Sequence, residues 1–221
     1  MIDWSCIDTV LLDMDGTLLD LHFDNFFWLE HLPREYARLH RITEAESTER
    51  LHGRFSAEVG SLQWYCLDHW SKQLDMDIAA LKREMQHMIR ARPFALEFLE
   101  RLRASDLDVV MVTNAHRKTL EIKMAEVDIT HWFDRVVVSH DLQAPKEQQA
   151  FWHRLQALHP FDPARTLLID DTERVLESAR EYGIAHLLTL LQPDSQQQKR
   201  LDTRFPGIHH FDEIMPSETA L

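Results

Sequence analysis

Several residue types that mark common protein classes are scarce in this chain. Only two of its 221 residues are cysteines, and Cys6 and Cys66 lie far apart among apolar neighbours. Small secreted proteins stabilised by disulfides carry more cysteine, so we expect two buried thiols in a reducing compartment. The 14 histidines form neither an H-E-x-x-H pattern nor a cluster with cysteine at zinc spacing. The sequence therefore indicates neither a disulfide framework nor a zinc site.

Long apolar runs and an excess of positive charge are also absent. No apolar segment approaches membrane-spanning length, and no basic segment leads into a short apolar one as in a secretion signal. Lys and Arg number 24 against 37 for Asp and Glu, which gives a formal net charge of -13. Nucleic acids and anionic membranes favour clustered Lys and Arg, so we expect neither as a partner. The cytoplasm is the location we expect.

The most informative segment is a short apolar run that leads into two acids and a glycine. Thr9 to Leu12 is nearly continuous in apolar character, which predicts a buried strand of a parallel sheet. Gly16 supplies the turn that ends it. Asp13 and Asp15 therefore follow the carboxyl end of a strand, where open α/β sheets bind their ligands. Two acids this close repel each other unless a cation or a shared proton compensates, as at a magnesium site or beside a carboxylate nucleophile.

Three further strand-like segments also end in polar side chains. In chain order they lead to Thr113-Asn114, to a loop that holds Lys146, and to Asp170-Asp171. Thr113 and Asn114 can hydrogen-bond phosphate oxygens, and Lys146 can neutralise their charge. Asp170 and Asp171 add oxygen ligands for a hard cation. Each fragment alone is weak evidence, but the ordered set of four predicts phosphoryl chemistry.

Together the four motifs resemble those of the haloacid dehalogenase (HAD) superfamily of phosphatases, over nearly the whole chain. They read Asp13-Met14-Asp15-Gly16-Thr17, Thr113-Asn114, Lys146 and Asp170-Asp171. The resemblance implies that Asp13 attacks phosphorus to form an aspartyl-phosphate, and that Asp15 acts as general acid and then as general base. It also implies that Thr113 and Lys146 hold the phosphoryl group. The chain departs from the usual pattern in that Pro145 precedes the lysine instead of following it.

The same resemblance implies a Mg²⁺ ion, for which Mn²⁺ or Co²⁺ could substitute. Its ligands would be the Asp13 carboxylate, the backbone carbonyl of Asp15 and an acid of the last motif. Asp171 aligns best with that acid, because a Ser or Thr commonly follows it and Thr172 does so here. Asp170 would then be a second or outer acid of the metal site.

The spacing of apolar residues divides the chain into an α/β part and an inserted helical part. Four stretches before residue 93 show helical spacing: 24–32, 43–55, 61–74 and 78–90. After it, strand and helix patterns alternate, which indicates a parallel sheet with helices on both faces. The strands are expected at 108–113, 135–139, 165–170 and 186–190, and the helices at 95–104, 117–127, 147–158 and 173–182.

We therefore expect an α/β fold with a Rossmann-like parallel sheet core, as in the HAD fold. Residues 1–20 and 93–221 would form the catalytic core, and residues 21–92 would form an α-helical cap inserted after the first strand. In the HAD superfamily such an insert closes over the active site. Residues 192–200 are polar and rich in glutamine, which predicts a surface loop or a weak helix.

Substrate choice is expected to come mostly from the cap. On a helix over 61–74, Trp64 and Asp68 lie off the apolar side, where the indole could stack on a purine while the carboxylate accepts its N–H groups. Packing of Trp64 against another cap helix is the alternative. His116 could line the phosphate or sugar site. Further candidates for the pocket lining are Phe23, Asp24 and Phe27.

Sequence segments of both core and cap are also similar to those of bacterial nucleotidases that act on GMP and IMP. The similar segments include Asn25 with Phe27-Trp28, Trp64 to Asp68 and Thr113 to His116. This implies hydrolysis of purine nucleoside 5′-monophosphates, small-molecule phosphomonoesters. A phosphosugar phosphatase or mutase would share the same core, and a non-catalytic module that binds phosphometabolites is an alternative of another class. A dehalogenase would need neither Asp15 nor a metal. The sequence leaves the oligomeric state open.

Overall fold

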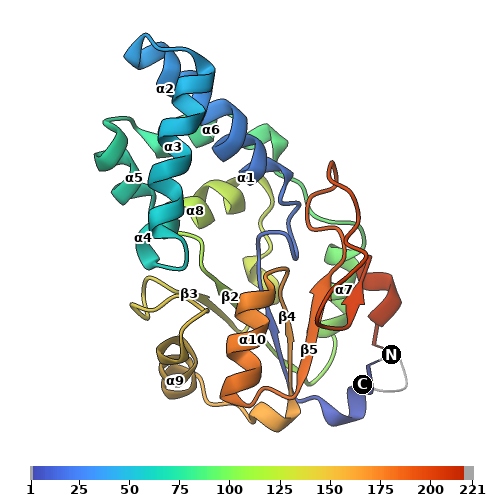
Figure 1. The fold of residues 1–221 in the computed structure, drawn as a ribbon. Coiled ribbons are helices and arrows are strands. Elements are labelled where there is room, and N and C mark those ends of the chain that lie inside the picture. Colours follow the sequence, from blue (N-terminus) through green and yellow to red (C-terminus); the bar gives the residue numbers. More distant parts are fainter. Residues whose placement is uncertain (1, 217–221) are drawn as a thin grey trace.

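The computed structural model of the chain describes residues 2–216, so residues 1 and 217–221 of the expected core lie outside it. Its centre is a sheet of six strands in the order β3-β2-β1-β4-β5-β6, all paired in parallel (Figure 1). The strands are β1 (Thr9–Leu12), β2 (Asp108–Thr113), β3 (Arg135–Val138), β4 (Thr166–Ile169), β5 (His186–Leu190) and β6 (Gly207–Ile208). The predicted parallel α/β sheet is confirmed.

Helices cover both faces of this sheet because successive residues of a buried strand point to opposite sides. Val10 and Leu12 of β1 belong to one core cluster, which takes in the apolar faces of α7 (Ala95–Arg103) and α8 (Arg117–Glu126). Leu11 belongs to a second cluster with α9 (Gln149–Leu158) and α10 (Glu173–Tyr182). All four residues of β1 are buried, which is the physical content of its unbroken apolar run.

The residues between β1 and α7 form a group of helices at the carboxyl end of the strands (Figure 1). They comprise α1 (His22–Phe26), η2 (Phe27–His31), α2 (Leu32–His40), α3 (Glu44–Glu58), α4 (Leu62–Tyr65), α5 (Leu67–Leu74), α6 (Ile78–Glu84) and η3 (Gln86–Met88). The two segments that connect them to the sheet run side by side: Arg92 donates its backbone N–H to Leu18, and Asp20 donates to Arg90. The exact boundaries between core and cap stay a prediction.

The first inserted helix is longer than the sequence predicts. Its expected end at residue 32 is wrong, because a π-helical turn over Phe27–His31 joins α1 to α2 and the helical run continues to His40. Pro33 comes two residues after the π-helical turn, and it has no N–H to donate to the helical hydrogen bonds at this point.

The single helix expected over residues 61–74 is also wrong. It is interrupted at Cys66, whose backbone is extended (φ -85°, ψ 110°), so α4 ends at Tyr65 and α5 begins at Leu67. The break is stabilised locally, because the Cys66 sulfur accepts the backbone N–H of His69. As a result, the side chains of α4 and α5 do not share the faces that one continuous helix would give them.

Smaller differences concern short elements and the cysteines. The expected helix over 78–90 ends at Glu84, and β6 was not predicted because two residues carry no periodicity. Residues 192–200 form the predicted loop. Both cysteines are free, but Cys6 is exposed and Cys66 is half-buried, so the prediction of buried thiols is wrong. Within residues 2–216, no helix is both long and apolar enough to cross a bilayer.

Candidate active site

The register of the central strands brings the two acidic motifs together. Leu12 of β1 pairs with Met111 of β2 on one side and with Ile169 of β4 on the other. Asp13 and Asp170 are the next residues along their strands, so they emerge beside each other at the carboxyl edge of the sheet. This follows from the parallel pairing alone, since neighbouring parallel strands end at the same edge.

Lys146 lies buried between these two acids. Its ammonium is 2.5 Å from Oδ1 of Asp13 and 2.6 Å from Oδ2 of Asp170, and it donates to the carbonyl oxygen of Val112 at 3.1 Å. Burial would lower the pKa of Lys146, but the carboxylates of Asp13 and Asp170 raise it above its usual range. Lys146 therefore stays charged and is held in one position.

Three buried carboxylates gather around this lysine. One oxygen from each of Asp13, Asp170 and Asp171 lies within 4.8 Å of the others. Burial raises the pKa of Asp13 and Asp171 to about 7 and that of Asp170 to about 6, and mutual repulsion among the acids adds to the effect. These raised pKa values disfavour full ionisation of the three carboxylates near neutral pH beside Lys146 alone. This donor set fits a hard divalent cation such as Mg²⁺, which prefers carboxylate oxygens.

Asp170 and Asp171 differ in how fully they are engaged by the protein. Both oxygens of Asp170 have partners, because Lys146 contacts one and the backbone N–H of Thr172 donates to the other at 2.9 Å. The carboxylate of Asp171 accepts from the hydroxyl of its neighbour Thr172 at 3.2 Å, and Arg200 lies 3.9 Å from its Oδ2. Asp171 is thus the acid with more free lone pairs for a cation.

Gly16 makes room for the Asp171 carboxylate. Its φ of +79° lies in the left-handed region, and a Cβ at this position would stand 2.7 Å from Cγ and Oδ2 of Asp171. A real side chain never approaches this closely, so the glycine is required twice, by the turn and by the acid opposite it. The turn of the first motif therefore fits against the last motif.

Asn114 connects the lysine loop to the inserted helices. Its Oδ1 accepts the backbone N–H of Lys146 at 3.0 Å, and its Nδ2 donates to Glu147 at 2.9 Å. The hydroxyl of Tyr65, on α4, donates to the other oxygen of Glu147 at 2.6 Å. Nearby, the hydroxyl of Thr113 accepts the N–H of Ala115 at 3.0 Å, which leaves its own hydrogen free to donate.

Asp15 has a lysine of its own. Lys123, on α8, donates to Asp15 and also to Asp24 on α1. Burial raises the pKa of Asp15, and the ammonium of Lys123 opposes this shift. Burial acts on Asp24 in the same direction, but the ammonium groups of Lys123 and Lys82 prevail and lower the pKa of Asp24 to about 2.

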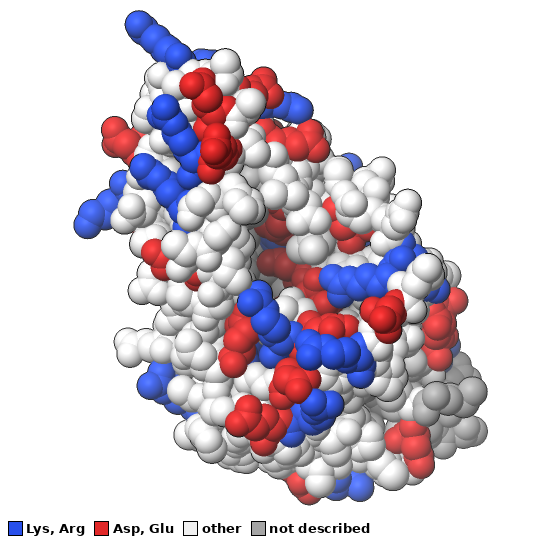
Figure 2. All heavy atoms as spheres, viewed as in Figure 1, with Lys and Arg blue, Asp and Glu red and all other residues white. Residues whose placement is uncertain are grey.

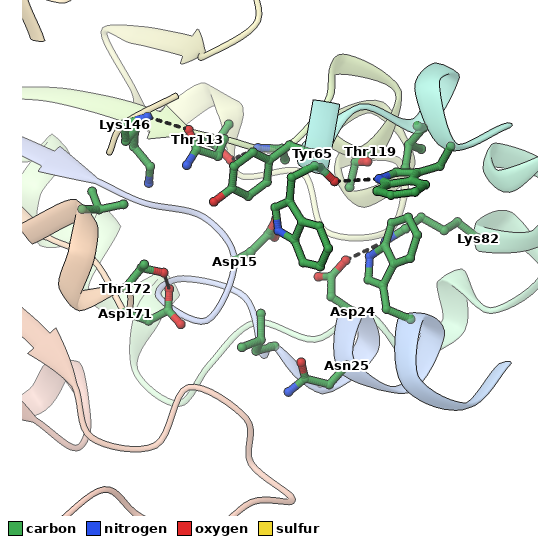
Figure 3. Close-up of a pocket in the computed structure, with 18 of the residues that line it drawn as sticks. Asp15, Asp24, Asn25, Tyr65, Lys82, Thr113, Thr119, Lys146, Asp171 and Thr172 are labelled. Carbon is green, nitrogen blue, oxygen red and sulfur yellow. Dashed lines mark hydrogen bonds and ion pairs between the residues drawn. The ribbon is translucent and has the colours of Figure 1, made fainter. Parts of the chain in front are cut away.

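A cavity of about 290 Å³ lies between the sheet edge and the inserted helices. Asp15, Thr113, Asn114, Lys146 and Asp171 line it from the core (Figure 3). The inserted helices contribute an aromatic wall made of Trp28, Trp64, Tyr65 and Trp70. Figure 2 shows the hollow from outside, with acidic side chains at its floor and basic side chains beside its mouth.

Four of the residues considered for the substrate pocket lie outside this cavity: Phe23, Phe27, Asp68 and His116. Phe23 and Phe27 are buried in the core, whereas Asp24, the third candidate of that group, lines the cavity. Asp68 does not line it; its side chain is 57% exposed and pairs with Lys118 of α8 at 2.5 Å. His116 does not line it either, and its ring packs against His140 with ring centroids 5.0 Å apart. The break at Cys66 explains why Asp68 lies outside the cavity while Trp64 lines it. The two side chains lie on separate helices and so point in different directions.

Trp64 packs against neighbouring helices of the insert, as the alternative from the sequence has it, and it also borders the cavity. It packs edge-on against Phe55 of α3, with ring centroids 5.8 Å apart, and against Trp70 at 6.3 Å. The core of the inserted helices and the wall of the cavity are therefore built from the same rings.

Sequence reasoning missed four residues around the cavity: Tyr65, Lys82, Lys123 and Glu147. For the two lysines a signal was present, because both interrupt the apolar side of a helix. Lys82 is buried with Ile78 on α6, and Lys123 is buried with Leu120 on α8. A lysine in such a stripe needs a buried partner. No local signal marks Tyr65 or Glu147, whose contact joins residues 82 positions apart.

Comparison with known proteins agrees with this geometry. Residues 10–189 match the family model described as haloacid dehalogenase-like hydrolase. The chain belongs to this family. The match spans all four motifs and the helices inserted between the first two, so the resemblance inferred from the motifs is confirmed.

Proteins similar to this chain include one named for its activity and two solved structures. GMP/IMP nucleotidase YrfG of Escherichia coli K12 is 37% identical over 216 residues, which cover 98% of this chain and 97% of that protein. A HAD phosphatase from Thermococcus onnurineus superposes with a TM-score of 0.75 at 20% identity, over 94% of this chain and 95% of that one. The HAD-hydrolase YfnB from Bacillus subtilis, solved bound to magnesium, superposes with a TM-score of 0.62 at 17% identity, over 94% and 96%.

The fit between Gly16 and Asp171 can be tested by Gly16→Ala. We expect Mg²⁺ to raise the melting temperature of the wild type and to have no such effect on the variant, because the new methyl group displaces the Asp171 carboxylate. The backbone strain itself should cost about 1–2 kcal/mol of unfolding free energy. Thermal unfolding with and without Mg²⁺ measures both effects.

Gly60→Ala is the matched control for this substitution. Gly60 has a φ of +82°, close to that of Gly16, and nothing lies within 4 Å of an added Cβ. This variant should carry the strain and keep the Mg²⁺ effect. A Gly16→Ala protein that gains as much stability from Mg²⁺ as the wild type would contradict the role assigned to the contact with Asp171.

Proposed function

We propose that the chain is a Mg²⁺-dependent phosphatase that converts purine nucleoside 5′-monophosphates, GMP and IMP in particular, to nucleoside and phosphate through an aspartyl-phosphate. The observation that carries the proposal is the cavity, which has the phosphate-binding lysine and acids on one side and tryptophans on the other. The similarity to proteins named GMP/IMP nucleotidase supports the substrate, because it covers the inserted helices as well as the core.

Asp13 is the nucleophile in this proposal. Lys146 holds one of its oxygens, and the other attacks phosphorus while the bond from phosphorus to the ester oxygen breaks. Lys146 and Thr113 contact the nonbridging phosphoryl oxygens. A carboxylate and a phosphate dianion repel each other, so the reaction needs positive charge at contact distance, and Lys146 supplies part of it.

The remaining positive charge is assigned to Mg²⁺. Asp13, Asp171 and the backbone carbonyl of Asp15 would hold the ion, with Asp170 in an outer position between Lys146 and Thr172. When bound, Mg²⁺ neutralises charge on the phosphoryl group and orients it toward the nucleophile, and Mn²⁺ or Co²⁺ could replace it.

Asp15 is the acid and then the base. Its proton goes to the ester oxygen as the nucleoside leaves, and the resulting carboxylate takes a proton from the water that hydrolyses the aspartyl-phosphate. Burial raises the pKa of Asp15, which favours the protonated form that the first step requires. The inserted helices above the cavity keep bulk water away from both steps.

The aromatic wall is the binding surface for the base. Trp28, Trp64 and Trp70 line the cavity from the inserted helices, and an indole face can stack on a purine. Asp68 and His116 are not part of this surface, because the cavity does not reach them. The volume of about 290 Å³ is close to the lower end of the range, roughly 300–1,000 Å³, that small-molecule sites occupy.

Phosphate release from a panel of monophosphates tests the reaction and the substrate together. The panel comprises GMP, IMP, their deoxy forms, CMP, UMP and sugar phosphates, each with Mg²⁺ and with EDTA. We expect the highest kcat/KM for GMP and IMP and loss of all turnover in EDTA. Metal-dependent turnover of sugar phosphates alone would replace the substrate but keep the chemistry. An enzyme active in EDTA would contradict the metal site.

Asp13→Asn tests the nucleophile. The amide has the shape of the carboxylate but cannot attack phosphorus, so turnover of GMP should fall below detection while the far-ultraviolet circular dichroism spectrum stays unchanged. Acid-quenched wild-type enzyme incubated with ³²P-labelled GMP should carry label that the variant lacks. Retained turnover by Asp13→Asn in the presence of Mg²⁺ would contradict the assignment.

Trp64→Leu tests the base surface. Loss of one stacking contact should raise KM for GMP about 5- to 150-fold, the equivalent of roughly 1–3 kcal/mol. Turnover of ribose 5-phosphate, which has no base, should change less than about twofold if Trp64 contacts only the base.

Trp132→Leu is the matched control, because Trp132 is a partly buried tryptophan that does not line the cavity. It should leave both substrates unaffected. Equal losses on GMP and ribose 5-phosphate in Trp64→Leu would show that Trp64 supports the inserted helices without contacting the base.

A further inference from the structure

Four charges of alternating sign, two of them on fully buried lysines, run from the active site into the inserted helices. Asp15 accepts from Lys123, which also donates to Asp24, and Asp24 accepts from Lys82 at 2.6 Å. Asp15 and Lys123 belong to the core, whereas Asp24 and Lys82 lie on α1 and α6. The side chains of both lysines are only 1% exposed. This chain of charges is therefore a polar connection between core and insert in which both acids face the cavity and both lysines are shielded from water.

Stability alone does not account for these residues. Removing charges from water is costly, and buried ion pairs are often no more stabilising than apolar residues of the same size. Both lysines stand where an apolar side chain would fit. Lys123 is buried beside Leu120 and Ile122 on α8, and the ammonium of Lys82 lies 4.8 Å from the ring centroids of Phe23 and Phe27. Such positions point to a role for the charge itself.

Two of the buried lysines each bridge a pair of acids. Lys146 bridges Asp13 and Asp170, and Lys123 bridges Asp15 and Asp24. Figure 3 shows Asp15 between the group of Lys146 and Asp171 on one side and that of Asp24 and Lys82 on the other. Lys123 does not line the cavity, although Asp15 does. It therefore reaches Asp15 from behind, away from the space that substrate would occupy.

We propose that Lys123 is a positioning residue for Asp15, and that Asp24 of the insert holds Lys123 in place. The inference rests on the proposed function, in which Asp15 protonates the leaving ester oxygen and later activates water. A general acid works only within hydrogen-bond reach of that oxygen, and a small displacement of a catalytic group is costly. Lys123 keeps the Asp15 carboxyl group in place at the wall of the cavity.

This role predicts a dependence on the leaving group. A nucleoside alkoxide needs a proton as it departs, whereas p-nitrophenolate leaves without one. Lys123→Met should therefore lower kcat for GMP about 100- to 1,000-fold, within the range for a positioned acid, and change the initial burst of p-nitrophenol from p-nitrophenyl phosphate less than about threefold. Steady-state release after the burst should be slow, because Asp15 also activates water in the second step. Stopped-flow absorbance and phosphate release measure these rates.

Lys118→Met is the matched control. Lys118 is on the same helix and also pairs with an acid of the insert, Asp68 at 2.5 Å, but it does so at the surface and does not touch Asp15. It should leave all three rates within about twofold, as expected for an exposed ion pair. If Lys123→Met fails to fold, the double variant Lys123→Met/Asp24→Asn replaces it, because it removes one charge of each sign and should show the same leaving-group pattern.

The outcomes separate this inference from the proposed function. A wild type without Mg²⁺-dependent turnover of any phosphate ester would refute the proposed function itself. If the wild type is active but prefers sugar phosphates, ribose 5-phosphate replaces GMP in the same comparison. If Lys123→Met loses GMP turnover and the p-nitrophenol burst equally, Lys123 supports the whole site. If neither rate changes, Lys123 does not act on Asp15. Either result would overturn the positioning role.

Discussion

Repulsion among buried acids is the constraint on which the rest of the site depends. Asp13, Asp170 and Asp171 converge because their strands are neighbours in a parallel sheet, and the sheet edge offers them no bulk water. Lys146 compensates part of this charge, and the raised pKa of each acid shows that the compensation is incomplete. A site with this deficit favours a divalent cation, and beside that cation it favours an anionic ligand, even in a chain with a net charge of -13.

The same constraint explains where the lysines lie. Lys146 and Lys123 each contact two acids and Lys82 contacts Asp24, so that no buried ammonium is left as an isolated charge in a poorly hydrated interior. Lys146 comes from the loop after β3, and Lys123 from α8, which follows β2. The ion pairs of Lys123 connect Asp15 of the core with Asp24 of the insert. The docking of the inserted helices and the arrangement of the acidic side chains therefore depend on the same ion pairs.

Aromatic side chains of the inserted helices both pack in the core of the insert and line the cavity. Trp64 and Trp70 pack edge-on around Phe55 and at the same time face the cavity. A change in one ring would alter both the core of the insert and the shape of the binding surface, because interiors are close-packed and transmit small displacements. The contact of Tyr65 with Glu147 then links this aromatic wall to the loop of Lys146 through Asn114.

The sequence by itself determined the parallel sheet, the order of the motifs and the polar residues that meet at the carboxyl edge of the sheet. These were predictable because Asp13 and Asp170 directly follow their strands, Thr113 is the last residue of its strand, and strand patterns are local. Only the tertiary structure decided which residues of the insert face the cavity. Cys66 breaks a helix that periodicity alone predicts as continuous, so Trp64 lines the cavity and Asp68 does not. Lys82 and Lys123 belong to the site for the same reason: their partners are distant in sequence, and only packing brings those charges together.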